Sequence, residues 1–482
     1  MRRLNAFDAQ FLAAESGNTH GHYCGLIVCG PREDGSSITR EDVVALVAER
    51  IDRLPVLRWR VAPAPLGIAH PVVVDGPVEI GEHVTEERLE APADGRAVAG
   101  VIERMLVERM DRSRPLWELR VVHGLAEGRT AIVAALHHAV ADGLSAGYVF
   151  ATLQDPAPPV PDHPPGEVVP RTAPGRPALL AGAVASAVTH PVGALRRARR
   201  TLANLDQTPT LRSFPGVRAL SLGARRRAGR DGASSEYVQA PRTRLNGPLS
   251  PERRVAFETF PFAEIRRIKA AHGVTINDVV VALIAGALRR RLSATGDLPD
   301  EPLVAFIPVS VRPLEELTAF GNQFSSFIVP LPTDRATALE RLRGAHEAMA
   351  QAKARHRDVP DTLLPDANGL IPPVLFGPVS SAAVRLLGSG ALAPPMNLLL
   401  SNVPGPPKPL SMAGAPVIAQ LPMSLVLDGV GLNITAVSYA QDLAVGAVAD
   451  AEALPDAWDL MTDLQTELDE LSATADAAAD QG

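Results

Sequence analysis

Two adjacent histidines followed by an aspartate and a glycine carry the clearest chemistry in the chain. His137–Gly143 reads HHAVADG, and a pattern of the form H-H-x-x-x-D-G is specific enough to be rare by chance. A neutral histidine can take a proton from a hydroxyl group and later return it to a leaving group. The pattern therefore indicates acid–base chemistry on a hydroxyl-bearing substrate.

The elements around this motif should separate the two histidines. Thr130–Leu136 is typical of a buried strand, and Gly143 opens a helix. Adjacent side chains at a strand end point to opposite sides, so one histidine can face a reaction site while the other faces the core. Asp142 is suited to an N-cap and could instead hold an arginine. The alternative that both histidines are only structural stays open.

The chain divides into two α+β parts around a segment rich in proline and arginine. We predict domains at 1–154 and 246–482, each long enough to bury a core, and a crossover at 155–245. Prolines between 155 and 177 oppose a helix or a central strand. From 196 to 244 there are 12 arginines and three acids. This stretch is either a solvated crossover or a peripheral contact with anionic lipid.

Apolar periodicity predicts most of the remaining elements. A capping-box pattern at Thr39–Asp42 begins one helix. Further helices are expected at Ala97–Met110, Phe262–Ala271, Ile276–Leu292, Arg335–Ala354 and Asp456–Leu471. Strands are expected at Leu116–Val122, Thr130–Leu136, Leu303–Val309, Gln323–Leu331, Met396–Leu400, Leu432–Ser438 and Leu443–Val448.

Composition excludes several classes of protein. The 482 residues are 46% hydrophobic and 21% charged, as in a globular protein, and the net charge of −7 gives no reason to expect a nucleic-acid partner. Cys24 and Cys29 would lie on opposite faces of a strand, so they cannot pair, and a reducing compartment is expected. We see neither a signal peptide nor an apolar run long enough to span a bilayer, which favours a cytoplasmic protein able to touch a lipid surface.

Seven further segments resemble those of the bacterial wax ester synthase/diacylglycerol acyltransferase family, within the superfamily of CoA-dependent acyltransferases. They are Phe7–Leu12, Arg114–Glu118, Thr275–Val280, Pro308–Arg312, Gly321–Gln323, Ser401–Pro406 and Leu432–Tyr439. Together with H-H-x-x-x-D-G they run in order from about residue 5 to 456, and only 155–245 has no confident counterpart.

The resemblance implies two chloramphenicol-acetyltransferase-like domains with an active-site channel at their interface. His138 would be the general base, and His137 and Asp142, followed by Gly143, would keep the loop in shape. In condensation-domain relatives an arginine pairs with the motif aspartate, which points to Arg58 here. The D-F-G-W-G segment of other superfamily members is absent, so no oxyanion role transfers through it.

The implied reaction moves a fatty acyl group from acyl-CoA to diacylglycerol, with a long-chain fatty alcohol as the alternative acceptor. Asn277, which Asp278 follows at a helix start, and Ser310 are candidate donors to the oxyanion. We expect no metal and no cofactor beyond acyl-CoA as co-substrate. Because the lipids are insoluble, we expect work at a lipid surface, such as a membrane or lipid droplet.

Three other interpretations compete with this one. Gly143–Gly147 matches the G-x-S-x-G elbow of serine esterases, which would make Ser145 a nucleophile, yet the motif is not directly after the strand and no histidine follows His356. His20, His22 and Cys24 could share one face of a strand but lack a fourth zinc ligand at familiar spacing. A non-catalytic lipid-handling protein of this fold would be expected to have lost His138.

Overall fold

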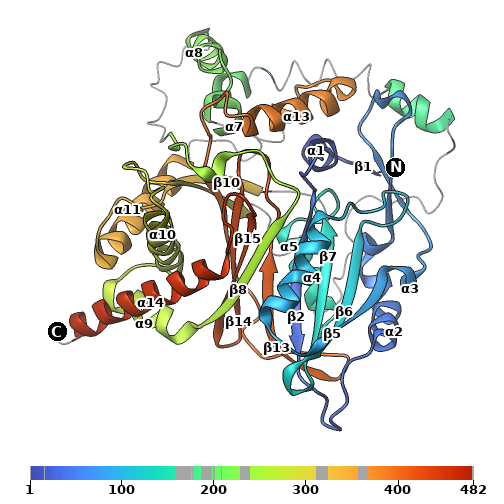
Figure 1. Ribbon diagram of the computed structural model, residues 1–482. Coiled ribbons are helices and arrows are strands. Elements are labelled where there is room, and N and C mark those ends of the chain that lie inside the picture. The colour runs from blue at the N-terminus through green and yellow to red at the C-terminus, as the bar shows by residue number, and fades with distance from the viewer. Residues whose placement is uncertain are drawn as a thin grey trace.

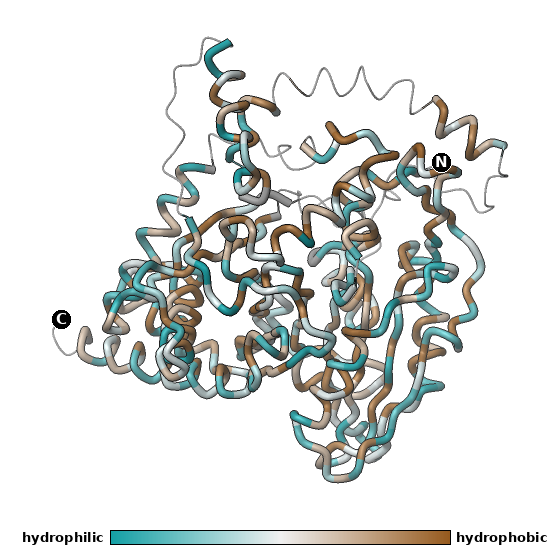
Figure 2. Tube along the Cα trace, turned by 45° about the horizontal axis from the view of Figure 1, so that its top comes forward, coloured by the Kyte–Doolittle hydropathy of each residue, from teal (hydrophilic) through white to brown (hydrophobic). Residues whose placement is uncertain are grey.

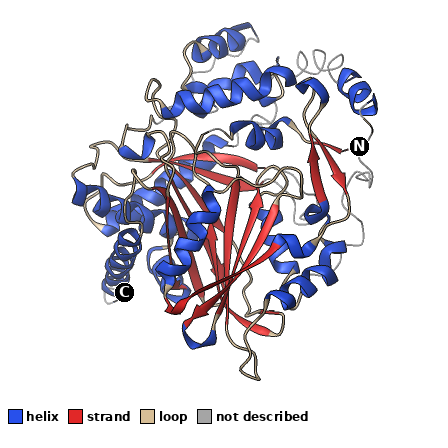
Figure 3. Ribbon diagram, turned by 45° about the vertical axis from the view of Figure 1, so that its right-hand side comes forward, coloured by secondary structure: helices blue, strands red, loops and turns tan. Residues whose placement is uncertain are grey.

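The computed structural model describes residues 2–15, 17–157, 175, 177–185, 198, 201–207, 209–227, 239–310, 324–356 and 367–479. Two six-stranded sheets lie next to each other in the middle of the molecule, with helices on the outside (Figures 1 and 3). Figure 2 shows hydrophobic and hydrophilic residues interleaved along the helices. The molecule is therefore a mixed α+β protein, as the sequence predicts.

The first sheet is built mainly from the N-terminal part of the chain. Its order is β12-β13-β2-β7-β6-β5. The bounds are β2 (His22–Cys29), β5 (Val84–Ala93), β6 (Trp117–Leu125), β7 (Thr130–His137), β12 (Ser411–Met412) and β13 (Ala415–Met423). Every residue of β7 is buried, because both faces of the sheet are covered. Cys24 and Cys29 belong to separate core clusters and are free thiols, as their spacing predicts.

Helices and a small three-stranded sheet lie around this first sheet. The small sheet has the order β1-β4-β3. The bounds are β1 (Arg2–Arg3), β3 (Trp59–Ala62), β4 (Val72–Asp75), α1 (Ala6–Ala14), α2 (Arg40–Arg50), α3 (Ile80–His83) and α4 (Gly95–Val107). The predicted capping box is present, with Thr39 and Asp42 each bonded to the other's backbone.

The second large sheet belongs to the C-terminal part and has the order β10-β9-β11-β14-β15-β8. Its strands are β8 (Arg253–Pro261), β9 (Val304–Ser310), β10 (Phe324–Pro330), β11 (Leu398–Val403), β14 (Leu432–Tyr439) and β15 (Asp442–Asp450). Its helices are α9 (Phe262–His272), α10 (Ile276–Thr295), α11 (Ala338–His356) and α14 (Trp458–Ala479). We call each large sheet with its surrounding helices a body. Every residue of α10 from Asp278 to Leu288 is buried, so α10 is the central helix of this second body.

One strand crosses between the two bodies. Although β13 comes late in the chain, it pairs antiparallel with β2 of the first sheet, and Leu421 lies opposite Leu26. The chain then returns to the second sheet through β14. Residues 411–423 of the predicted 246–482 range therefore complete the sheet of the other body.

The helices at the top of the molecule belong to the crossover and to one helix that was not predicted from the sequence (Figure 1). The described parts of the crossover include helical residues 177–185, α7 (Pro209–Arg212) and α8 (Val217–Arg227). Arg196, Arg197, Arg199 and Arg200 lie outside the described residues. Near α7 and α8 runs α13 (Pro373–Gly388), which packs against α1 (Figure 1).

No single helix among the described residues has the length and apolar composition to cross a bilayer. The pair α9 and α10 passes the same test together but is bent by 106°. Since α10 is the core helix of the second body, its apolar residues are explained by packing.

Candidate active site

A cavity of about 1800 Å³ opens between the two bodies. Both large sheets contribute to its wall, and so do α1, α10, α11 and α13. Most of its wall is apolar. A cavity of this size and lining can hold long hydrocarbon chains, and its polar groups are few enough to be considered one by one.

The two histidines of the motif face different surroundings, as the strand geometry predicts. His138 lines the cavity, where its ring stacks on Phe11 with 4.8 Å between ring centroids and contacts Tyr23 at 4.5 Å. His137 ends β7 and is 1% exposed. The backbone N–H of His138 donates to the carbonyl oxygen of Gly21 at 2.8 Å. This bond ties the cavity-facing histidine to the segment before β2.

His137 is held in one orientation by hydrogen bonds on both ring nitrogens. Its Nδ1 accepts from the backbone N–H of Ala139 at 3.0 Å. Since Nδ1 is an acceptor, Nε2 carries the proton and donates to Oε1 of Glu15 at 3.3 Å. The first histidine of the motif is therefore an internal brace for the turn that carries His138.

Glu15 is a functional residue that the sequence did not reveal. Its buried carboxylate also accepts from the N–H of Gly21 at 2.8 Å and from Arg112. Burial by itself raises the pKa of Glu15, but its hydrogen bonds with His137, Gly21 and Arg112 hold it well below its ordinary value. Glu15 thus stays ionised and fixes both His137 and Gly21.

Gly21 has to be a glycine for steric reasons. A Cβ at this position would lie 2.6 Å from Nε2 of His137. The missing side chain lets the backbone approach the histidine, so the Gly21 carbonyl can reach the N–H of His138. No short motif would have pointed to this contact, because the two segments are far apart in the chain.

Asp142 caps the helix that follows the motif. α5 (Gly143–Thr152) begins at Gly143, and Oδ1 of Asp142 accepts from the backbone N–H of Ser145 at 2.8 Å. Asp142 also lines the cavity. The side chain of Ser145 is fully buried, and Ser145 is not among the residues that line the cavity.

The predicted pairing of Arg58 with Asp142 is wrong. Arg58 holds Asp75 with two hydrogen bonds of 2.9 and 3.1 Å, and it donates to Asp52 at 3.0 Å. These partners lie in the small-sheet region of the N-terminal body, where Arg58 ends a short 3-10 helix just before β3. The arginine therefore joins local elements and does not reach the motif loop.

Asn277 and its neighbour divide into a cavity residue and a structural residue. Asn277 lines the cavity, and its Oδ1 accepts a short hydrogen bond from the amide of Asn402, another lining residue. Among the described residues its own NH₂ group has no acceptor, so it can serve as a donor. Asp278 is buried, completes the capping box of α10 with Thr275, and accepts from Nδ1 of His346 at 2.8 Å. Ser310 ends β9, but its side chain lies outside what is described.

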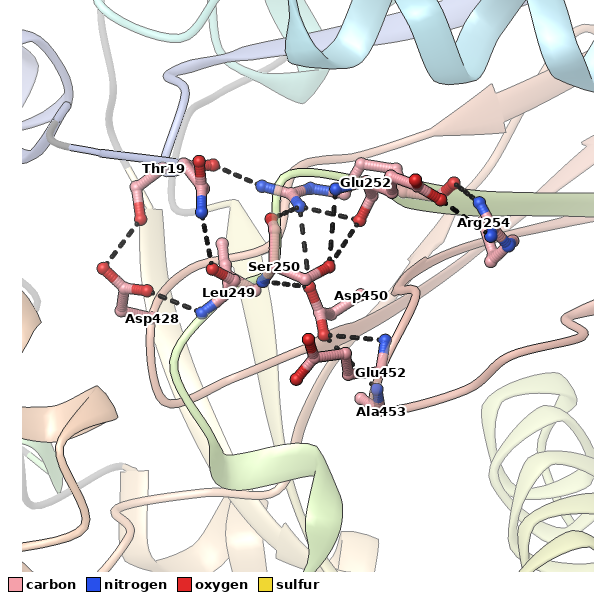
Figure 4. Close-up of polar contacts among 11 residues, drawn as sticks. Thr19, Leu249, Ser250, Glu252, Arg254, Asp428, Asp450, Glu452 and Ala453 are labelled. Atoms are coloured by element: carbon pink, nitrogen blue, oxygen red, sulfur yellow. Dashed lines mark hydrogen bonds and ion pairs between the residues drawn. The ribbon is translucent and has the colours of Figure 1, made fainter.

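Polar contacts tie the segment before β2 to the C-terminal body (Figure 4). The hydroxyl of Thr19 donates to Asp428 at 3.2 Å, and the N–H of Leu249 donates to the same carboxylate at 2.8 Å. The buried guanidinium of Arg253 donates to the carbonyl of Asn18. Residues 18–21 therefore link the domain interface to the backbone of His138.

The zinc alternative gains no geometric support from the part of the chain that is described. There, no three His, Cys, Asp or Glu side chains gather in a way that could hold a metal ion. His22 instead contacts the carbonyl oxygen of Met105 through Nε2 at 2.8 Å.

A histidine on the turn between β7 and α5, facing a large apolar cavity, is the arrangement that the sequence predicts for a two-domain acyltransferase. Residues 4–280 match the family model of the wax ester synthase/diacylglycerol acyltransferase catalytic domain, and residues 320–472 match that of its C-terminal domain. The chain belongs to the wax ester synthase/diacylglycerol acyltransferase family, and the sequence-based prediction of an enzyme of this class is confirmed.

Individual proteins agree with this membership. A Mycobacterium tuberculosis H37Rv protein, provisionally named as a diacylglycerol O-acyltransferase, is 32% identical, covering 99% of this chain and 98% of its own. The wax ester synthase/diacylglycerol acyltransferase of Marinobacter aquaeolei VT8 has a TM-score of 0.68 and 26% identity, covering 98% of this chain and all of its own.

A more distant structure shares the fold alone. The starter condensation domain of rhizomide synthetase, solved with C8-CoA and Leu-SNAC, has a TM-score of 0.52 and 14% identity, with 98% of this chain and 94% of that chain covered. The predicted two-domain acyltransferase fold is confirmed by these two structures.

Proposed function

We propose that this protein transfers a long-chain acyl group from acyl-CoA to diacylglycerol, producing triacylglycerol. The observation that carries the proposal is the position of His138, whose ring faces an apolar cavity of about 1800 Å³ between the two bodies. The cavity accommodates acyl and glyceride chains, and His138 is a titratable group beside them.

In this mechanism His138 takes the proton of the acceptor hydroxyl as its oxygen attacks the thioester carbonyl carbon. The new C–O bond forms and the carbonyl becomes an oxyanion, which the NH₂ group of Asn277 can stabilise; one such donor is typically worth about 3–4 kcal/mol. The C–S bond then breaks, and the CoA thiolate takes the proton back from the His138 imidazolium. The apolar wall keeps water from the thioester.

A long-chain fatty alcohol is the second candidate acceptor, and the apolar lining supports it equally. Radiolabelled palmitoyl-CoA offered with diacylglycerol and, separately, with hexadecanol distinguishes the two by thin-layer chromatography. We expect labelled triacylglycerol as the main ester. A predominance of wax ester would reassign the acceptor, and free fatty acid alone in both reactions would exclude transfer.

Two matched substitutions separate the transferase from a serine hydrolase. We expect His138→Ala to lower turnover at least about 100-fold, because general-base catalysis supplies a factor of 10² to 10⁴. Ser145→Ala should leave turnover nearly unchanged, since Ser145 is not a cavity-lining residue. The opposite pattern would favour the hydrolase.

We also propose that the protein works while bound to the surface of a membrane or lipid droplet, through the top of the molecule. Four large apolar side chains of α13 are exposed, namely Val374, Leu375, Val379 and Leu386. Leu220 and Leu222 of the nearby α8 are exposed too, and α8 ends in two exposed arginines, Arg226 and Arg227, after the buried Arg225 that pairs with Asp206. Apolar side chains flanked by arginines suit the surface of an anionic lipid layer.

Co-sedimentation with phosphatidylglycerol vesicles tests this surface. Leu375→Asp should weaken binding, because a carboxylate would have to enter the lipid interface. Ile418→Asp is the matched control, since Ile418 is also exposed but lies on β13, at the opposite end of the molecule in Figure 1. Equal binding of both variants and the wild type would reject α13 as the contact.

A further inference from the structure

The cavity has one positive side chain of the Lys or Arg type among its described lining residues. That side chain is Lys353 of α11. Apart from the histidine, the other charged lining residues are Asp142 and Asp428, and both are engaged. Asp142 caps α5, while Asp428 accepts from Thr19 and from the backbone of Leu249. An ammonium group in so apolar a wall needs an explanation.

Lys353 lies where the cavity meets the surface. It is exposed, while Met349, one helical turn earlier on α11, is buried and also lines the cavity. The wall beside them includes Phe306 of β9 and Phe327 of β10. Among the described residues Lys353 has neither an ion-pair nor a hydrogen-bond partner. Its charge is therefore available to a ligand at this opening.

A second opening has the opposite character. Val379 and Leu386 of α13 are exposed and also line the cavity, so the cavity reaches the surface beside α13 as well. In Figure 1, α11 lies at the left of the molecule and α13 runs across its top. One end of the cavity thus presents an ammonium group and the other presents aliphatic side chains.

The two openings match the two ends of the substrate pair. CoA is a polyanion whose phosphate groups remain in water while the acyl chain enters the apolar cavity. A lysine ammonium is a compact charge that binds phosphate well. Diacylglycerol has no charge and would enter from lipid, which suits the α13 end.

We propose that Lys353 binds a phosphate group of CoA, so that the thioester enters beside α11 and the lipid acceptor enters beside α13. This inference rests on the proposed use of acyl-CoA as donor. It assigns a substrate-binding role to Lys353 and no role in the chemical step. Its loss should therefore change binding of the donor and leave the rate at saturation alone.

The test compares two donors that share the thioester and differ in their phosphates: palmitoyl-CoA and palmitoyl-pantetheine. For Lys353→Gln we expect the KM for palmitoyl-CoA to rise about three- to tenfold, the range for one partly exposed charged contact to phosphate. The kcat, and the KM for palmitoyl-pantetheine, should stay within twofold of wild type. Lys353→Arg should restore most of the affinity for palmitoyl-CoA.

Salt and a matched lysine provide the controls. In 1 M NaCl, where the Debye length is about 3 Å, the difference in KM between Lys353→Gln and wild type should largely vanish. Lys269→Gln should behave as wild type, since Lys269 is an exposed residue of α9 that does not line the cavity. An equal rise in KM for both donors, or no rise for either, would overturn the inference.

Equilibrium binding of free CoA separates this inference from the proposed function. If the wild type made no ester but bound CoA more tightly than Lys353→Gln, the proposed reaction would fail while the phosphate contact stood. If ester formed but the two proteins bound CoA equally, the contact would fail while the reaction stood.

Discussion

His137 and His138 show how one peptide bond can separate a buried, bracing side chain from one that faces a cavity. His137 has both ring nitrogens bonded inside the protein, so its ring is held in one orientation and cannot reach a substrate. His138 has its ring in the cavity wall, between Phe11 and Tyr23. The aromatic neighbours restrict how the ring can turn, which suits the proposed general base, because it must meet a hydroxyl group in one direction.

Glu15 should be essential for the shape of this site. Glu15→Ala removes the acceptor for the ring of His137 and the N–H of Gly21, and each buried donor left unsatisfied costs about 1–3 kcal/mol. We expect a lower free energy of unfolding in urea and a clear loss of turnover at temperatures where the variant is still folded.

Arg112→Ala is the control for that experiment. It removes one partner of the same carboxylate, but Arg112 is about half exposed and should contribute less than about 1 kcal/mol. If Glu15→Ala were as stable and as active as Arg112→Ala, the bracing role of Glu15 would be refuted.

Buried histidines should make the folded state sensitive to mild acid. Burial lowers the pKa of His22 to about 4, and it also lowers the pKa values of His20 and His83. Between the unfolded value of about 6.5 and the folded value, the unfolded chain binds more protons, so the free energy of unfolding falls as pH decreases through this window. For His22 alone the loss is on the order of 3 kcal/mol.

Urea unfolding at pH 7.5 and pH 5.0 measures this effect. His22→Gln should lose less stability between the two pH values than the wild type, because one titrating group is gone. The low pKa of Glu15 acts in a different window, since its contribution is lost only as pH falls below the ordinary value of about 4.3. An identical pH dependence for variant and wild type would contradict the assignment to His22.

At the scale of elements, α10 depends on a close contact with α14. A Cβ at Gly286 would overlap the carboxylate of Glu467, which is fully buried and held by Arg341 at 2.6 and 2.8 Å. The carboxylate cannot move aside without losing its arginine. Packing therefore requires a glycine at position 286, although a glycine inside a helix is otherwise unfavourable.

Gly286→Ala should destabilise the protein by about 1–3 kcal/mol through overpacking. Gly147→Ala is the matched comparison, because Gly147 is also inside a helix but has open space where a Cβ would be. There the gain in helix propensity, up to about 1 kcal/mol, should make the protein equally or more stable. Urea unfolding of both variants measures the difference, and a stable Gly286→Ala would show that α14 can shift.

For the whole molecule, the crossing of β13 implies that the two bodies unfold together. The strand extends the first sheet beside β2 and continues through the loop after Met423 into β14 of the second sheet. Thr19 and Asp428 add a direct bond across the interface. Neither sheet can be lost without disturbing the other.

The three tryptophans allow this to be tested. Trp59 and Trp117 lie in the first body and Trp458 in the second. A Trp458→Phe variant reports the first body, and a Trp59→Phe, Trp117→Phe double variant reports the second. In each variant we expect fluorescence and far-ultraviolet circular dichroism to give the same urea midpoint. Midpoints that differ between the two probes would indicate bodies that unfold independently.

Much of the local architecture could be predicted from the sequence. The strand before His137, the helix after Asp142 and the capping box at Thr39 all follow from periodicity and from side chains that bond backbone three residues away. These signals lie within a few residues of one another, so they can be recognised without knowledge of the fold. Other elements were missed, and one of them is β13, which contains Pro416 and Pro422.

Another missed element is α13, because a proline inside a segment, here Pro378, locally opposes a helix. Pro373 is in its first turn, where the absent N–H costs nothing, and Pro378 is tolerated inside it. The tertiary setting decides in its favour, because the buried Phe376 packs into the N-terminal core. A local rule includes the hydrogen bond that a proline removes from the helix. It does not include the apolar surface of α13 that tertiary packing buries.

What the sequence determined by itself is the H-H-x-x-x-D-G motif, the elements that carry it and, through short segments in fixed order, the family. Only the tertiary structure decided which groups meet the motif. Glu15 contacts His137, which is 122 residues away in the chain, and Arg58 binds Asp75 and not Asp142. Such contacts depend on how sheets and loops come together, and they leave no periodic or capping signal in the chain.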